Sequence, residues 1–218
     1  MDRRFLHETL HNNLDSVTDK RIAILGCGAL GANLAVSLAR RGFRKFFLFD
    51  FDKIDEHNIS TQPWTKQDLG RRKVDILNSL LFSISGAESY TYWKRLESAE
   101  DIIYGLNEGW EVKADLFIDC FDNMKARAEA YTLGHKLKHL YHVLHTGLSN
   151  QNTGEVTWNE RYTVPNDIKI NDPCNYPLSR TLIDLTVVAA SESVLDFLIN
   201  KTKTDYFINA NKLDIRKC

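Results

Sequence analysis

The chain has 218 residues, of which 43% are hydrophobic, and its formal net charge at pH 7 is −1. This length is enough to bury one sizeable core, and the balanced charge gives no electrostatic reason to bind nucleic acid or an anionic membrane. No apolar stretch approaches the ~20 residues that span a bilayer, and the N-terminus lacks the apolar core of a signal peptide.

Strand-like and helix-like segments alternate along the first half of the chain, as a doubly wound sheet requires. A strand at 22–25 is followed by a helix through about residue 41 and by a second strand that ends at residue 50. A helical stripe of apolar residues over 74–81 precedes a strand at 90–93, a helix at about 99–106 and a strand at 116–119.

The second half begins with a helix to about residue 139 and a strand at 143–144. Residues 154–158 are expected to start an antiparallel extension, and 160–179, which hold three of the four prolines, to form a crossover loop. A helix at about 181–199 and strands at 206–208 and 213–215 complete the chain. We therefore predict a single α/β domain over 1–218, with a doubly wound, mostly parallel Rossmann-like sheet and an antiparallel C-terminal extension.

A glycine-rich turn joins the first strand to the first helix: Gly26-Cys27-Gly28-Ala29-Leu30-Gly31. Gly26 allows a tight turn, Gly28 lets a phosphate approach the backbone, and Gly31 lets the helix pack closely on the strand. The second strand ends at Asp50, about 20 residues further on, where a carboxylate that binds a ribose hydroxyl is expected. The chain is therefore predicted to bind a nucleotide.

Further motifs follow the glycine turn in a definite order. They are Asp50-Phe51-Asp52, Asn58, Gly70-Arg71-Arg72-Lys73 and Asp119-Cys120-Phe121-Asp122-Asn123. With this combination, the chain resembles the ThiF/MoeB-type adenylyltransferases, bacterial relatives of ubiquitin-activating enzymes, from about residue 20 to about residue 200. The glycine turn alone is shared with dehydrogenases, whereas the ordered series is far more specific.

The resemblance implies a site for ATP and Mg²⁺. Lys73 would be a phosphate cation, with Arg72 beside it, and Asp122 would hold the metal. The nucleotide-binding residues would be Gly26, Gly28, Gly31, Asp50, Asp52, Asn58 and Lys73. Each reading has a structural alternative: a solvated lysine for Lys73, a helix N-cap for Asp122 and a turn residue for Asn58.

Two positions depart from the family's pattern. The family usually has N-x-x-R-Q, and here Thr61 stands at the place of the arginine. In the N-terminal R-[FY]-x-R-Q segment, His7 replaces the second arginine, which reaches the partner subunit's ATP site. Arg71 or Arg72 could fill the space that Thr61 leaves. Charge-assisted hydrogen bonds are worth about 1.5–3 kcal/mol each, so two uncompensated losses would leave an inert member of the family.

The four cysteines lie far apart, which indicates a reducing cytosol and neither a disulfide framework nor a zinc site. Cys174 stands where family members often carry a cysteine that forms a thioester or acyl disulfide, and a buried structural thiol is an equal alternative. Cys27 and Cys120 are expected to be packing residues. Arg127 is expected to tie its helix to an acid. The histidines show no ligand spacing and are expected to cap helices or line surfaces; they include His135, His139, His142 and His145.

The function predicted from these residues is ATP-dependent adenylation of the C-terminal carboxylate of a small ubiquitin-like or sulfur-carrier protein with a C-terminal glycine. The products are an acyl-adenylate and pyrophosphate, and a thioester or acyl disulfide could follow. We expect a cytoplasmic homodimer in which residues 1–20 reach the partner subunit. The alternatives are adenylation of a ribosomal peptide, an inert partner subunit and, least favoured by the motifs, an NAD-dependent oxidoreductase.

Overall fold

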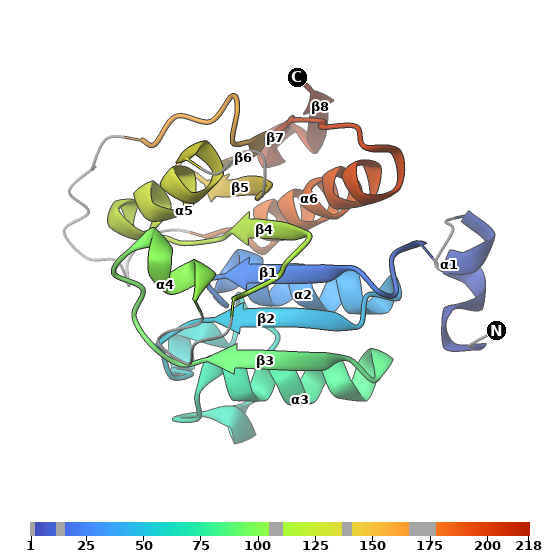
Figure 1. Ribbon diagram of the computed structural model, residues 1–218, viewed down its shortest axis with the longest axis vertical. Helices are drawn as coiled ribbons and strands as arrows, with labels where there is room; N and C mark the ends of the chain where they lie inside the picture. The colour runs from blue at the N-terminus through green and yellow to red at the C-terminus, as the bar shows by residue number, and fades with distance from the viewer. Residues whose placement is uncertain (1–2, 12–15, 105–110, 137–140, 166–177) are drawn as a thin grey trace.

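The computed structural model describes residues 3–11, 16–104, 111–136, 141–165 and 178–218. Its centre is an eight-stranded sheet in the order β3-β2-β1-β4-β5-β6-β7-β8 (Figure 1). The strands are β1 (Arg21–Leu25), β2 (Lys45–Phe49), β3 (Glu88–Tyr92), β4 (Leu116–Asp119), β5 (Val143–Leu148), β6 (Thr153–Trp158), β7 (Tyr206–Asn209) and β8 (Asp214–Lys217).

The longer helices connect these strands. They are α2 (Ala29–Arg40), α3 (Lys73–Ser85), α4 (Ala99–Ile103), α5 (Met124–Lys136) and α6 (Arg180–Asn200). Short 3₁₀ turns, η3 (Glu56–Asn58) and η4 (Lys66–Asp68), lie between β2 and α3, and η6 (Ala210–Lys212) lies between β7 and β8. No helix of the described residues is long and apolar enough to cross a bilayer.

The first five strands are parallel and the last three antiparallel, which confirms the predicted fold class. β1 pairs in parallel with β2 and β4, so that Leu25 lies opposite both Phe49 and Asp119. The β5–β6, β6–β7 and β7–β8 pairs are antiparallel. Because the parallel strands end at one edge of the sheet, the turns after β1, β2 and β4 meet there, at the place where ligands bind in open α/β sheets.

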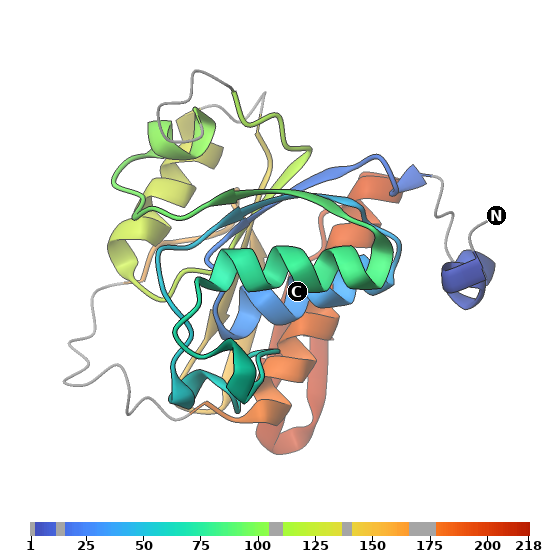
Figure 2. The same cartoon turned by 90° about the horizontal axis from the view of Figure 1, so that it is seen from below.

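Alternating side chains of the central strands build two hydrophobic layers. Ile22 and Ile24 of β1 point to the layer that contains the apolar residues of α2, α3 and α6, whereas Ala23 and Leu25 point to the layer of α4 and α5. Figure 2 shows the blue, teal and orange helices on one side of the sheet and the green and yellow helices on the other. Burial on both faces explains why these strands are continuous apolar runs in the sequence.

Two strands have other ends than predicted, because polar residues interrupt the apolar runs from which the strands were predicted. β3 begins at Glu88, before the predicted start at residue 90. It is the edge strand of the sheet and its residues are largely exposed, so no apolar run marks its start in the sequence. β5 continues to Leu148, beyond the apolar pair predicted, because it pairs with β6 as far as Gly154. Of the predicted crossover loop, residues 166–177 lie outside the described ranges.

The N-terminal segment packs at the other end of the sheet. It contains η1 (Arg3–Phe5) and α1 (Leu6–His11). Phe5 is buried in the layer of α2, α3 and α6, and a guanidinium nitrogen of Arg4 would lie 3.8 Å from a Cβ built at Gly86, which follows α3. Figure 1 shows α1 beyond the end of the sheet opposite to the arrowheads of β1–β4.

Candidate nucleotide-binding site

The glycine turn after β1 has the geometry of a phosphate-binding loop. Gly26 has a φ of 96°, and its N–H donates to the Phe49 carbonyl at 2.8 Å. A Cβ at Gly31 would lie 1.9 Å from the Gly26 carbonyl oxygen, so only glycine fits there. A Cβ at Gly28 would meet nothing within 4 Å, so the space above this residue is open. No side chain caps the N-terminus of α2 at Gly28, and its first N–H groups therefore face a place where an anion would satisfy them.

Asp50 fastens this loop to the turn after β2. Its Oδ2 accepts a hydrogen bond from the Cys27 N–H and its Oδ1 accepts one from the Asp52 N–H, each at 2.7 Å. Burial raises the pKa of Asp50, while the nearby Lys73 ammonium lowers it. Each carboxylate oxygen has a second lone pair, so Asp50 can hold the loop and still accept a ribose hydroxyl.

Lys73, the first residue of α3, is buried beside the two acids. Its Nζ donates to Asp52 Oδ2 at 2.9 Å, and its backbone N–H donates to the Asp52 carbonyl at 3.1 Å. Burial alone would lower the pKa of Lys73, but the Asp50 and Asp52 carboxylates offset this effect, and the pKa lies above its ordinary value. Lys73 is therefore a cation held in place within the site, and not the solvated lysine of the structural alternative.

Asn58 is buried in η3 and has a structural contact of its own. Its Oδ1 accepts a hydrogen bond from the Asp55 N–H at 3.0 Å in a capping box. The Asn58 amide NH₂ has no hydrogen-bond partner among the described residues. This leaves two donors for a ligand, so the turn role and the predicted nucleotide role are compatible.

Asp122 and Asn123 follow β4 on the other side of the loop. Asn123 Oδ1 accepts a hydrogen bond from the Ala126 N–H at 2.9 Å, so Asn123 is the residue that caps α5. Asp122 is exposed and has no hydrogen-bond or ion-pair partner in the described part of the chain. A free carboxylate beside a phosphate loop suits Mg²⁺, which binds through one or two carboxylates and otherwise through substrate phosphates and water. The described residues contain no group of three acidic, histidine or cysteine side chains that would hold a metal without such a substrate.

A cleft beside Asp50 extends the site. Its apolar walls would suit the flat base of a nucleotide. They are formed by Phe49, Phe51, Leu96, Phe121 and Ala126. Its polar lining consists of Asp50, Lys94, Arg95, Asn123 and Lys125. The Arg95 guanidinium lies 4.1 Å from the centre of the Phe51 ring.

The two arginines expected to replace the family's missing arginine have other partners. The Arg72 guanidinium stacks on the Trp93 ring, 3.8 Å from its centre, and Arg71 lies 3.8 Å from Asp68. The phosphate role of Arg72 stays a prediction.

A different arginine, Arg180 at the start of α6, contacts Thr61. It donates to the Thr61 carbonyl at 3.3 Å and to Asn33 Oδ1 at 3.2 Å. Asn33 in turn donates to the carbonyl of Ala29, the first residue of α2, at 2.6 Å. The guanidinium therefore lies next to the position where the arginine is missing. Sequence reasoning missed this contact because the two residues are 119 positions apart.

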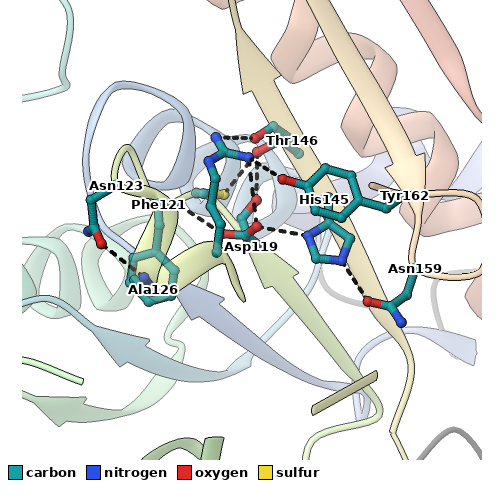
Figure 3. Close-up of polar contacts among 10 residues, drawn as sticks. Asp119, Phe121, Asn123, Ala126, His145, Thr146, Asn159 and Tyr162 are labelled. Carbon is teal, nitrogen blue, oxygen red and sulfur yellow. Dashed lines mark hydrogen bonds and ion pairs between the residues drawn. The ribbon is translucent and has the colours of Figure 1, made fainter. Parts of the chain in front are cut away.

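A buried polar network supports the turn that carries Asp122 (Figure 3). Asp119, the last residue of β4, accepts hydrogen bonds from the Phe121 N–H at 3.0 Å and shares one with His145 Nδ1 at 2.8 Å. The other ring nitrogen of His145 lies 2.7 Å from Asn159 Oδ1. The His145 ring stacks on Tyr162 with 3.7 Å between ring centres. His145 is thus completely buried, and the prediction that the histidines cap helices or line surfaces is wrong for it.

Arg127 closes the network from α5. Its guanidinium donates to the Thr146 carbonyl at 2.9 Å and to the Tyr162 hydroxyl at 3.3 Å, and it lies 3.7 Å from Asp119. Burial alone would lower the pKa of Arg127, but Asp119 outweighs this effect and the pKa is raised. The predicted tie between Arg127 and an acid is confirmed.

Burial disfavours the thiolate form of the two cysteines near the site. Burial raises the pKa of Cys120 to about 12 and the pKa of Cys27 well above its ordinary value. Both are packing residues, as predicted. Cys174 lies outside the described residues, so its role stays a prediction.

Comparisons with known proteins agree with this geometry. Among curated proteins, ubiquitin-like modifier-activating enzyme 5 of Bombyx mori is 27% identical over 132 residues, which are 58% of this chain and 34% of that protein. The enzyme of the same name from Drosophila simulans is 29% identical over 120 residues, covering 52% of this chain and 30% of that protein. The chain thus spans about a third of the length of these relatives.

Solved structures share the fold. Escherichia coli MccB with MccA-N7isoAsn matches with a TM-score of 0.78 at 16% identity, over 100% of this chain and 72% of that chain. E. coli MccB with ATP gives a TM-score of 0.76 at 16% identity, over 100% and 71%. PaaA gives 0.74 at 15% identity, again over 100% and 71%. The model of the ThiF family matches residues 3–159, and the chain therefore belongs to the ThiF family.

Proposed function

We propose that this protein uses ATP to adenylate the C-terminal carboxylate of a small ubiquitin-like or sulfur-carrier protein. The observation that carries the proposal is the arrangement at the ends of β1, β2 and β4. There, the open glycine loop follows β1, the buried Lys73 lies beside Asp52 of the turn after β2, and the exposed Asp122 follows β4. Membership of the ThiF family and the names of the curated relatives support the same class of reaction.

ATP would lie across the ends of the parallel strands. The phosphates would meet the N–H groups of the loop and of α2, the ribose would meet Asp50, and the base would enter the cleft between Phe51 and Phe121. Lys73 would neutralise phosphate oxygens, and Asp122 would hold Mg²⁺, which supplies Lewis-acid charge at the phosphates when it is bound.

The proposed reaction is an in-line displacement. A carboxylate oxygen of the carrier forms a bond to the α-phosphorus of ATP, and the bond from that phosphorus to the bridging oxygen of pyrophosphate breaks. Both reactants are anions, so the protein must offset charge and align them. Lys73, kept protonated by its two acids, and the N–H groups of α2 would do so without moving during the reaction.

Two other substrates or roles are alternatives to the carrier protein. The likeness to MccB extends to the fold alone, and a ribosomal peptide stays an alternative substrate. An inert partner subunit is the alternative suggested by Thr61 and His7. Arg180, which contacts the Thr61 carbonyl and also pairs with Asp184 at 2.9 Å, is the cation that we propose to offset the loss at Thr61. If a thioester or acyl disulfide follows adenylation, Cys174 is the proposed thiol.

Calorimetric titration with ATP and Mg²⁺, and separately with NAD, tests the choice of nucleotide. We expect ATP to bind at least tenfold more tightly, because Lys73 and Asp122 suit a triphosphate with a metal, and Lys73→Met to abolish the difference. Tighter binding of NAD would overturn the proposal. Carrier-dependent exchange of labelled pyrophosphate into ATP then tests the reaction itself.

A further inference from the structure

A second hollow lies at the opposite end of the sheet from the nucleotide site. Its volume is about 600 Å³. The residues that line it lie at or just before the starts of β1, β4 and β5 and at or just after the end of α6. The charged or titratable ones are Lys20, Arg21, Asp115, His142, Lys201 and Lys203. The five residues of β1 separate it from the glycine loop by about 16 Å at roughly 3.3 Å per residue, so the two sites are distinct.

Positive charge exceeds negative charge in this hollow. Arg21 pairs with Asp115 at 3.3 Å, and Lys203 pairs with Glu160. Lys20 and Lys201 have no carboxylate within ion-pair distance among the described residues. The acid next to Lys20 in the sequence, Asp19, is paired with Lys45 at 2.8 Å. Lys20 and Lys201 are therefore the two ammonium groups of this hollow that form no ion pair within the described part of the chain.

The hydrogen bonds of Lys201 to a backbone carbonyl and of Lys203 to His142 are both long. Lys201 Nζ reaches the Leu198 carbonyl at the end of α6 at 3.5 Å, which is long for a charged donor. Lys203 Nζ lies 3.4 Å from His142 Nδ1. Burial, followed by the charge of Lys203 and Lys201, lowers the pKa of His142, while Glu160 raises it. The charges of Lys201 and Lys203 therefore both act on the His142 ring.

We propose that this hollow binds a small molecule that carries a phosphate group. A phosphate monoester is a dianion near neutral pH, and its two charges match the two unpaired lysines. The apolar part of the lining, Ala114, Phe197 and Leu198, offers contact to an organic body attached to the phosphate. The site would lie on the same chain as the nucleotide site and would be occupied independently of it.

The test uses inorganic phosphate as the probe and the NMR signals of the His142 ring as the reporter. At constant ionic strength, we expect a saturable shift with phosphate and none with chloride. The double variant K20Q/K201Q should bind phosphate at least tenfold more weakly. The control K66Q/K212Q removes two exposed lysines that do not line the hollow, and it should bind phosphate like the wild type.

Three results would overturn the proposal. They are a shift that chloride reproduces, equal phosphate affinity in the two double variants, and a phosphoserine peptide that binds tenfold more tightly than phosphate, which would assign the hollow to a protein partner. ATP binding, measured in parallel, should be the same in all variants, because the nucleotide site is at the other end of the sheet. This measurement also shows that K20Q/K201Q is folded.

Discussion

Asp122 and Asn123 are neighbours with separate tasks at the end of β4. Asn123 caps α5, and Asp122 is exposed and has no partner in the described residues. Because Asn123 supplies the cap, no contact among the described residues gives the Asp122 carboxylate a structural role. This separation allows the metal role and the capping role to be tested one at a time.

We predict that Asp122→Asn lowers carrier-dependent pyrophosphate exchange on the order of 100-fold, because it removes the charge that would hold Mg²⁺. Its free energy of unfolding should equal that of the wild type. Asn123→Ala is the matched variant, and it should lower the free energy of unfolding by about 1 kcal/mol through loss of the cap. Urea unfolding and exchange assays measure both, and normal exchange by Asp122→Asn would remove this residue from the site.

Arg180 gives a second prediction at the scale of a residue. If its guanidinium replaces the family's missing arginine, Arg180→Gln should raise the KM for ATP at least tenfold, and Thr61→Arg in the same chain should restore it. Arg41→Gln is the control, because Arg41 also lies between α2 and α6 but pairs with Glu192 at the far end of α2. Equal KM values for Arg180→Gln and Arg41→Gln would show that Arg180 only joins two helices.

Short local motifs contain the candidate residues that sequence reasoning found: Asp50 and Asp122 lie just after β2 and β4, and Lys73 ends the motif that opens α3. Spacing placed Asp50, and the resemblance to the ThiF family assigned Lys73 and Asp122. The network around His145 carries no such signal, because Asp119, His145 and Asn159 meet only after β4 and β5 pair in parallel and β6 pairs with β5. A histidine inside the apolar run that begins at Val143 was the one local hint of a buried role.

At the scale of elements, the β1–α2 unit depends on contacts that a single methyl group would break. Helix α2 lies so close to the loop that a Cβ at Gly31 would overlap the Gly26 carbonyl, while a Cβ at Gly28 would enter open space. Both glycines belong to one motif, yet Gly31 serves packing, whereas Gly28 leaves open the space in which we propose that a phosphate binds.

This difference predicts opposite effects for two alanine substitutions. Gly31→Ala should destabilise the fold by several kcal/mol, since backbone would have to move. Gly28→Ala should unfold at the wild-type urea concentration but bind ATP at least tenfold more weakly, because the methyl group would occupy the space for a phosphate. Thermal or urea unfolding together with calorimetry measures both effects. Normal ATP affinity in Gly28→Ala would contradict the phosphate-binding role of the loop.

A similar close approach supports the buried network. A Cβ at Gly134, in the last turn of α5, would lie 2.5 Å from the side chain of Asn159. Glycine inside a helix costs about 1 kcal/mol relative to alanine. This glycine leaves room for the Asn159 side chain, which contacts His145. Contacts of this network thus join α5, β4, β5 and the residue after β6 around the turn that carries Asp122.

At the scale of the whole molecule, the alternation of strands and helices was enough to predict the parallel sheet and its antiparallel extension. The layer assignment of each helix also needed the pairing order of the strands, which no local pattern contains. The same pairing places the N-terminal segment. Phe5 is buried against the layer of α2, α3 and α6. Helix α1, which follows it, lies beyond the end of the sheet opposite to the glycine loop (Figure 1). This segment therefore does not serve the nucleotide site of its own chain.

The last prediction is that the N-terminal segment acts on the site of a second subunit. The variant Arg4→Ala/His7→Ala keeps Phe5, so it should fold, and as a homodimer it should lose most pyrophosphate exchange. Asp122→Asn should be equally inactive alone. When the two variants are unfolded together and refolded, random pairing makes half of the dimers mixed, and each mixed dimer has one intact site served by one intact segment. Exchange should then recover to roughly a quarter of the wild-type value, because the symmetric interface allows both subunits to pair freely.

Light scattering should give the mass of a dimer throughout. No recovery on mixing, or full activity in a strictly monomeric protein, would show that the segment has no role in a partner's site.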